Sequence, residues 1–181
     1  MPTTMPRFRD LRADEIECRV STASDKGTSL LLYKTARTDA NILDETVGPE
    51  NWQCRFYEVA GVTFCSLGIK AQGCDGAVEW VWKDDSGSAG NIEEEKSKAS
   101  DCFKRAGFKW GIGRSLYTAP FIWVPAERCN IRQGRNGRPT CFDHFRVEKI
   151  RIEGGRITGL SIWNETKACR AFVWQLAQTS N

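Results

Sequence analysis

The sequence lacks several features that define common classes of protein. It has no C-x-x-C pair among its eight cysteines, only one histidine, no Walker A loop and no dinucleotide fingerprint. No apolar run approaches the length of a membrane span, and the opening MPTTMPRFRD has no apolar signal-peptide core. These absences argue against a secreted disulfide scaffold, a phosphate-binding loop of the usual kind and a membrane anchor. We therefore expect a cytosolic protein with reduced thiols.

The single histidine also limits the catalytic chemistry that the chain can perform. The sequence around the serines, cysteines and acids identifies none of them as a partner of His144 in a catalytic triad. Cys129, Cys141 and His144 could form a zinc site with one further ligand, but their spacing matches no strong zinc signature. We expect a protein that is not an enzyme and needs no metal or other cofactor. The sequence leaves open whether these three residues ever bind metal.

The composition is that of an ordinary globular protein. The chain has 181 residues, of which 27% are charged and 40% are hydrophobic, enough for one domain with a real core. The formal net charge is only +3. Any nucleic-acid role must therefore come from local clusters of cations rather than from a basic field over the whole surface.

The apolar pattern predicts an α+β fold in which a helix packs across a β-meander. Helical spacing predicts a first helix over residues 8–20 and a second helix that begins near Ala36 and ends at Gly48-Pro49. Alternation of apolar and polar residues predicts antiparallel strands over 52–60, 62–71 and 76–83. A long helix then begins near Ile92 and ends in glycines. A C-terminal hairpin turning at Gly154-Gly155, and a further strand from Arg170, complete the prediction.

The long helix carries cations on a defined side. At about 100° per residue an apolar stripe forms. Its members are Ala99, Cys102, Phe103, Ala106 and Trp110. Lys98, Arg105 and Lys109 follow one flank of this stripe with only Asp101 near to pair with them, and Lys104 points nearly opposite, into solvent. Two interpretations remain: a core helix whose last-turn cations complement the helix dipole, or an anion-binding edge.

A second group of cations lies in the segment 126–140. Arg128, Arg132, Arg135 and Arg138 occur there among glycines and asparagines, and no acid lies between the first and the last of them. The segment is either a disordered solvated loop or an arm that contacts phosphates and orders on binding. The absence of acids favours the arm.

The aromatic residues invite a base-stacking hypothesis, which the pattern does not favour. Trp80 and Trp82 lie in apolar alternation and Trp110 lies on the helix stripe. Side chains in such positions are core residues more often than stacking platforms. We therefore interpret these tryptophans as core.

One enzymatic alternative deserves comparison. Asp84 or Asp85 followed by Glu94-x-Lys96 superficially resembles the acid and E-x-K site of a metal-dependent nuclease. Such sites place these groups on adjacent strands, whereas here the E-x-K opens a helix after a glycine-rich connector. A capping role for the acids is the better interpretation.

A family resemblance appears in the run EKSKASDCFKRAGFKWGIGRSLY. It resembles the helix signature of Rad-fifty-two-type single-strand annealing proteins, particularly their phage-encoded relatives, in which E-K-x-K-A leads through Asp to Lys-Arg-Ala, an aromatic-Gly pair and L-Y. Ile16-x-x-Arg19 and the G-x-x-x-W of Gly48 to Trp52 match the family's upstream elements. The resemblance covers roughly residues 8–124. The segment 126–140 and the cysteines match no family feature, and the hairpin over 144–175 matches only loosely.

The resemblance implies a β-β-β-α core, assembly into a ring or arc, and a basic groove that binds single-stranded DNA. It implies ATP-independent annealing in recombination and repair, in a bacterial host cell if the protein is phage-encoded, with an exonuclease or a single-strand binding protein as further partners. Lys104 and Arg105 match the family's DNA-contacting Lys-Arg pair, and Arg19 matches its groove arginine. Lys26 is a looser match. The first alternative is a protein that binds single-stranded DNA without annealing it. The second and less favoured alternative is the metal-dependent nuclease.

On this hypothesis the whole chain, 1–181, is one DNA-binding domain. The cations expected to contact DNA, from the helix, the resemblance and the arginine-rich segment together, are Arg19, Lys26, Lys98, Lys104, Arg105, Lys109, Arg114, Arg128, Arg132, Arg135 and Arg138.

Overall fold

The computed structural model describes residues 5–73, 76–87, 95–134 and 136–177. The chain divides into two compact units. Unit 1 consists of Met1–Arg9 and Lys34–Gly113, and unit 2 consists of Asp10–Tyr33 and Arg114–Asn181. Unit 2 is therefore built from two segments that flank most of unit 1 in the sequence.

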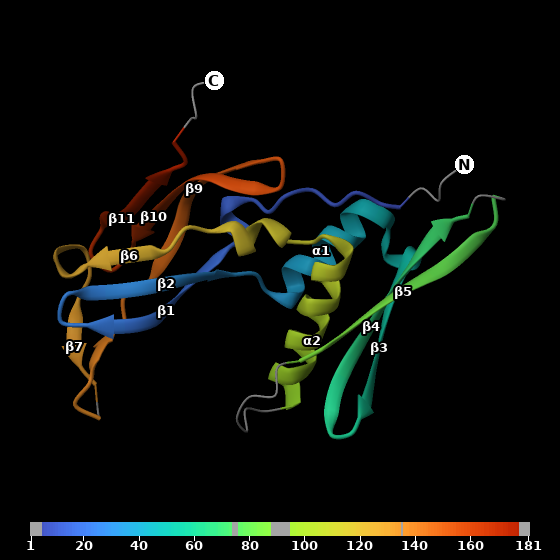
Figure 1. The fold of residues 1–181 in the computed structure, drawn as a ribbon, viewed down its shortest axis with the longest axis horizontal. Helices are drawn as coiled ribbons and strands as arrows, with labels where there is room; N and C mark the ends of the chain where they lie inside the picture. Colours follow the sequence, from blue (N-terminus) through green and yellow to red (C-terminus); the bar gives the residue numbers. More distant parts are fainter. Residues whose placement is uncertain (1–4, 74–75, 88–94, 135, 178–181) are drawn as a thin grey trace. The chain divides into compact units, whose positions relative to one another are not determined.

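Unit 1 contains a three-stranded antiparallel sheet (Figure 1). Its strands are β3 (Trp52–Val59), β4 (Val62–Gln72) and β5 (Val78–Ser86), in that spatial order. Cys65, Leu67 and Ile69 of the central strand share one face and are fully buried. The predicted strand ranges are confirmed, because the alternation in this stretch is a local signal that the sheet obeys.

Two helices complete unit 1. The second of them, α2 (Glu95–Trp110), lies against β4 and β5, with Cys102 and Ala106 of its apolar stripe fully buried. The indole of Trp110 donates to the carbonyl of Leu67 at 3.0 Å, which fixes the end of the helix on the central strand. The first, α1 (Ala36–Val47), begins where the hydroxyl of Thr35 accepts from the Thr38 amide, and the short helix η2 (Pro49–Asn51) follows it. The prediction of α1 is confirmed.

Unit 2 is built on a six-stranded antiparallel sheet (Figure 1). In spatial order its strands are β11 (Cys169–Gln175), β10 (Arg156–Asn164), β9 (Phe145–Glu153), β1 (Glu17–Ser24), β2 (Gly27–Tyr33) and β6 (Ile122–Pro125). The sheet is nearly closed into a barrel, since β11 also approaches β6. Between these edges the Arg128 guanidinium donates to the Arg170 carbonyl at 3.2 Å.

The inner face of this sheet forms the core of unit 2. Ile122, Val124 and Ile162 are fully or almost fully buried there. The remaining elements are η1 (Ala13–Glu15), η3 (Arg114–Thr118), η4 (Ala126–Arg128) and a two-stranded ribbon of β7 (Ile131–Gln133) and β8 (Pro139–Cys141). The predicted hairpin at Gly154-Gly155 is confirmed as the β9–β10 turn, where both glycines have positive φ.

The predicted fold class is wrong. It described the chain as one β-meander packed by a long helix, whereas the described residues contain eleven strands and only two α-helices. The finding that overturns it is the nearly closed six-stranded sheet, in which the C-terminal hairpin joins strands from the start of the chain. Pairing between segments so distant in sequence leaves no local pattern to detect.

The predicted first helix, 8–20, is also wrong. Its last four residues belong to strand β1, which pairs with β2 and, through Glu17 opposite Arg146, with β9. The apolar residues Leu11 and Ile16 are buried as expected, but their spacing fits a turn followed by a strand as well as it fits a helix. Strand pairing on both sides of β1 decides between these two conformations.

Candidate nucleic-acid interface

Four predicted DNA contacts lie on α2 in unit 1. We call Lys98, Lys104, Arg105 and Lys109 the α2 cations. Arg105 and Lys109 reach the edge strand β5, where both pair with the carboxylate of Asp85, at 3.3 Å and 3.7 Å respectively. Their side chains keep 44% and 47% of their surface exposed, so both can still meet an anion from solvent.

The ion pairs of the α2 cations differ from the sequence prediction. Asp101 was the only acid expected nearby, and it pairs with Lys104 at 3.7 Å. Asp85 is the partner that the sequence did not show, because its strand reaches α2 only in the folded unit. Lys104, which the sequence predicted to point into solvent, keeps only 27% of its side chain exposed. Lys98 is exposed.

A buried ion pair supports the middle of α2. The ammonium of Lys34 contacts both carboxylate oxygens of Asp39 and also donates to the Lys104 carbonyl at 3.3 Å. Burial lowers the pKa of the Lys34 ammonium and raises the pKa of the Asp39 carboxyl, while the attraction between the two groups opposes both shifts. The pair ties α1 to the turn of α2 that carries Lys104 and Arg105. Sequence reasoning did not single out either residue.

The other predicted DNA contacts that the structure describes lie in unit 2. They are Arg19 in β1, Lys26 in the β1–β2 turn, Arg114 in η3, Arg128 in η4, Arg132 in β7 and Arg138 before β8. All six are exposed. Arg135 lies outside the described residues. The β7–β8 ribbon shows that the segment is not simply a disordered loop, and the choice of a phosphate-contacting arm stays a prediction.

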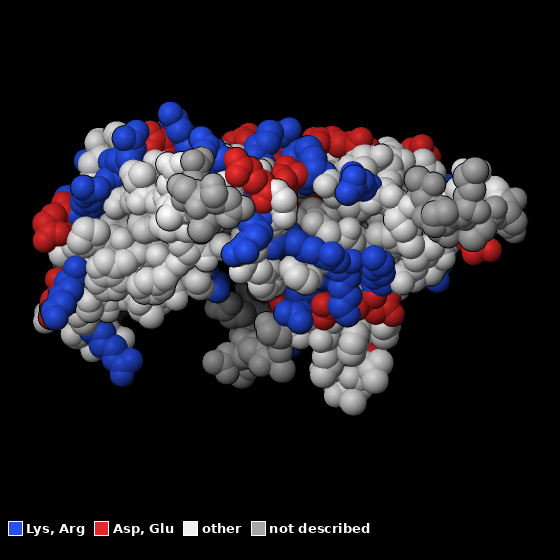
Figure 2. Space-filling model, turned by 45° about the horizontal axis from the view of Figure 1, so that its top comes forward, with Lys and Arg blue, Asp and Glu red and all other residues white. Residues whose placement is uncertain are grey.

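The charges on the surface are mixed rather than of one sign. Figure 2 shows groups of Lys and Arg with Asp and Glu close beside them. This distribution agrees with the small net charge of +3. An anionic partner would therefore be held by local groups such as the α2 cations.

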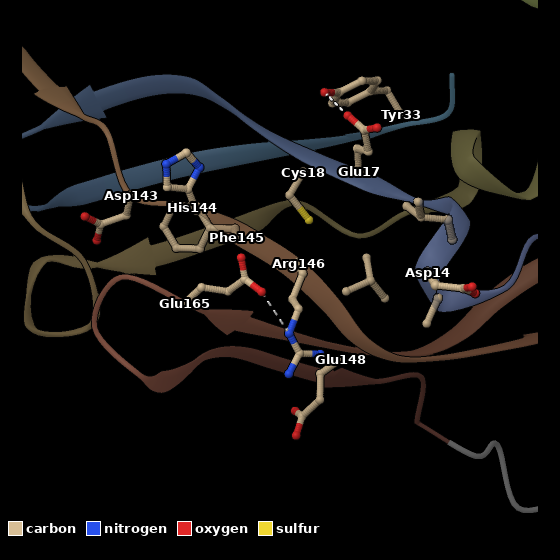
Figure 3. A pocket seen from close by; sticks show the side chains of 13 residues that line it. Asp14, Glu17, Cys18, Tyr33, Asp143, His144, Phe145, Arg146, Glu148 and Glu165 are labelled. Atoms are coloured by element: carbon tan, nitrogen blue, oxygen red, sulfur yellow. Dashed lines mark hydrogen bonds and ion pairs between the residues drawn. The ribbon is translucent and has the colours of Figure 1, made fainter. Parts of the chain in front are cut away.

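A pocket of about 710 Å³ lies in unit 2 and is lined by β1, β9 and their neighbours (Figure 3). Its acids already have partners: Glu17 accepts from the Tyr33 hydroxyl, and Glu165 pairs with Arg146 at 3.3 Å. Burial raises the pKa of the Cys18 thiol to about 12, so this cysteine is no nucleophile near neutral pH.

Among the described residues, those considered for metal chemistry do not come together as a site. The part of the chain that the structure describes contains no cluster of three His, Cys, Asp or Glu side chains that could hold an ion. Cys129 donates to the Pro125 carbonyl, and burial raises its pKa to about 11. In the nuclease alternative, Asp84 accepts from the Tyr57 hydroxyl and Asp85 pairs with Arg105 and Lys109, while Glu94 lies outside the described residues.

The interpretation of Trp80 and Trp82 as core residues is wrong. Both lie on the face of the unit 1 sheet opposite to the one that packs on α2, as the register of β5 with β4 requires. Trp80 is 36% exposed and Trp82 is partly exposed. Trp110, by contrast, is buried as predicted, with 7% of its surface exposed.

Among known proteins, the chain is similar to one whose name states that it binds single-stranded DNA. That relative is the single-stranded DNA-binding protein DdrA of Deinococcus radiodurans, with 30% identity over 128 residues. The match covers 70% of this chain and 58% of DdrA, so the chain spans a little over half of the relative's length. No protein-family profile and no solved structure matches the chain. No helix among the described residues is long and apolar enough to cross a membrane.

Proposed function

We propose that this chain binds single-stranded DNA and promotes the annealing of complementary strands, without ATP or a metal cofactor and without enzymatic activity. The observation that carries the proposal is the row of α2 cations at the edge of β5, where Arg105 and Lys109 remain almost half exposed. The similarity to DdrA supports the choice of single-stranded DNA as the partner.

The ion pairs at β5 suit this role. Asp85 holds Arg105 and Lys109 in place in the free protein, and partly exposed pairs of this kind contribute only about 0–1 kcal/mol each. A phosphate can therefore replace the carboxylate at little cost. Holding the strand by its phosphates leaves the bases free to test a second strand, and base pairing supplies the free energy of annealing.

The primary test is annealing of two labelled complementary oligonucleotides in EDTA and without nucleotide. We expect the protein to accelerate pairing over the spontaneous rate. Tight binding without acceleration would favour the second candidate, a single-strand binding protein that does not anneal, which the name of DdrA also supports. Absence of single-strand binding would refute both.

The salt dependence tests the electrostatic part of the proposal. The logarithm of affinity should fall with the logarithm of salt concentration with a slope of about −0.7 for each phosphate neutralised. Arg105→Ala should weaken binding and reduce the slope, whereas Arg37→Ala, which removes an exposed arginine on α1, should not. A slope near zero would count against a phosphate-based interface.

Light scattering would test the further proposal that the chain assembles into a ring or arc.

A further inference from the structure

The face of the unit 1 sheet that does not pack on α2 is rich in aromatic rings and cations. Strand register places Arg55 and Tyr57 of β3, Phe64 and Lys70 of β4, and Trp80, Trp82 and Asp84 of β5 on this outer face. Arg55, Tyr57 and Trp80 are exposed, and 41% of the surface of Tyr57 is accessible. Exposed aromatic side chains that gather on one face commonly mark an interaction site.

The Trp82 ring on this face lies against the central strand, and cations lie near the two tryptophan rings. A Cβ atom on Gly68 would meet the Trp82 ring at 2.7 Å, so glycine at this position lets the indole rest on the central strand. The Arg55 guanidinium lies 4.3 Å from the centre of that ring, and the Lys70 ammonium lies 5.3 Å from the Trp80 ring. The Tyr57 and Phe64 rings stack at 5.4 Å with only 13° between their planes. Tryptophan rings with cations near their faces suit planar ligands that also carry negative charge.

The outer face meets the α2 cations at one strand. β5 is an edge strand, and its residues alternate between the two sides of the sheet. Trp80 and Trp82 lie on the outer side, whereas Asp85 lies on the other side with Arg105 and Lys109. The ammonium of Lys109 also donates to the Asp84 carbonyl on the edge of β5. Phosphate-binding cations and ring faces are therefore separated by a single strand.

We propose that single-stranded nucleic acid runs along β5, with its phosphates on the α2 cations and its bases stacked on the outer sheet face at Trp80 and the Arg55–Trp82 pair. This inference rests on the proposed function and adds the base-contacting surface to it. Both a tryptophan ring and a planar guanidinium stack on bases of any sequence. Charge complementarity supports this occupant, because the charged residues of the face are Arg55, Lys70 and Asp84, and Asp84 accepts from the Tyr57 hydroxyl.

Stacking on this face is compatible with annealing. A base that lies on an indole or a guanidinium contacts it through its plane, so the hydrogen-bonding edge stays open to a complementary base. The outer face would hold bases in an unpaired and roughly parallel arrangement, which shortens the search for the correct register. The α2 cations alone would position only the backbone.

The test compares an oligothymidine with an abasic oligonucleotide of equal length, using fluorescence anisotropy on the full chain. We expect wild type to bind the abasic strand about tenfold more weakly or worse, because the abasic strand keeps its phosphates and loses its stacking. Trp80→Ala should lower oligothymidine affinity about tenfold and leave abasic affinity and the salt slope unchanged. Phe121→Ala is the matched control, because it removes an aromatic side chain that is 77% exposed in unit 2.

A second variant keeps the test decisive if Trp80→Ala does not fold. Arg55→Gln removes the guanidinium from an exposed strand position and should reduce the preference for oligothymidine even if Trp80→Ala fails to fold. Equal affinity of wild type for both strands, or no change in either variant, would overturn the stacking surface while leaving the proposed function intact. An equal loss for both strands, accompanied by a change in oligomeric state, would show that a second copy of the chain covers the face. Failure of wild type to bind any single strand would refute both proposals.

Discussion

Gly107 lies so close to Asp39 that a Cβ atom on the glycine would approach the Oδ2 atom of Asp39 to 2.6 Å. This glycine follows the Lys-Arg-Ala of α2, and the Asp39 carboxylate that it faces also contacts the ammonium of Lys34. Gly107 is therefore the position at which α2 contacts the buried Asp39 carboxylate of α1. The motif has a structural function as well as a proposed role in binding DNA.

Gly107→Ala should lower the melting temperature. Alanine favours a helix interior over glycine by up to about 1 kcal/mol, whereas inserting a methyl group into a filled site costs about 1–3 kcal/mol. The net effect is a loss, because the Asp39 oxygen cannot move without leaving Lys34. Asn41→Ala at an exposed position of α1 reports helix propensity alone and should be neutral or slightly stabilising. A higher melting temperature for Gly107→Ala would show that the close approach is not constraining.

The Lys34–Asp39 pair should show strong coupling in a double-mutant cycle. Lys34→Met leaves the carboxylate of Asp39 buried without its cation, which costs about 3–5 kcal/mol in comparable sites. Adding Asp39→Asn removes the unpaired charge and should recover part of this loss. Urea unfolding of the four proteins measures the coupling. Additive effects of the two substitutions would contradict a direct ion pair.

Asp85→Asn should tighten single-strand binding at low salt by about two- to tenfold, the value of two weak ion pairs. The substitution frees Arg105 and Lys109 from competition, and the asparagine oxygen can still accept from the Ser86 amide, as Asp85 does at 2.8 Å. Glu153→Gln in the β9–β10 hairpin makes the same change in net charge on unit 2 and serves as the control. Equal gains in both variants would indicate a general charge effect rather than local competition at β5.

Glu148 should contribute to stability against acid. Its carboxylate accepts two hydrogen bonds of 2.7 Å from Arg170, and a third from Ser161, which lower its pKa from 4.5 to about 2. Because the folded state holds this group ionised, its contribution is complete above about pH 4.5 and is lost as the pH falls toward 2. Thermal melts of Glu148→Gln should therefore converge with wild type over this range. A constant difference down to pH 2 would contradict this assignment.

The sequence predicts those parts of the fold that depend on neighbouring residues. α1 follows from its apolar spacing and from Gly48-Pro49 at its end, and β3 to β5 follow from alternation. Strand β1 escapes prediction because its partners include β9, far along the chain. The spacing of Ile16 and Val20 fits two conformations, and only the partner strands select one.

The candidate site shows the same limit. Alternation places Trp80 and Trp82 on one face of a strand correctly, but a period of two cannot say which face a helix will cover. The α2 cations follow from helical geometry, whereas their pairing with Asp85 depends on where α2 docks on β5. The sequence therefore predicted the side of the strand or helix on which these side chains lie. It did not predict which residues surround them in the folded unit.

The division of the chain also constrains the order in which the protein can form during synthesis. Lys34–Gly113 is continuous, so the main body of unit 1 can assemble once α2 has left the ribosome. The β1–β2 hairpin emerges earlier, but its partner strands β6 and β9 are synthesised only after unit 1. Until then it has two unpaired edges. Nascent chains in which Gly113 has emerged from the ribosome and β6 has not should expose β1 to protease while α2 is already protected.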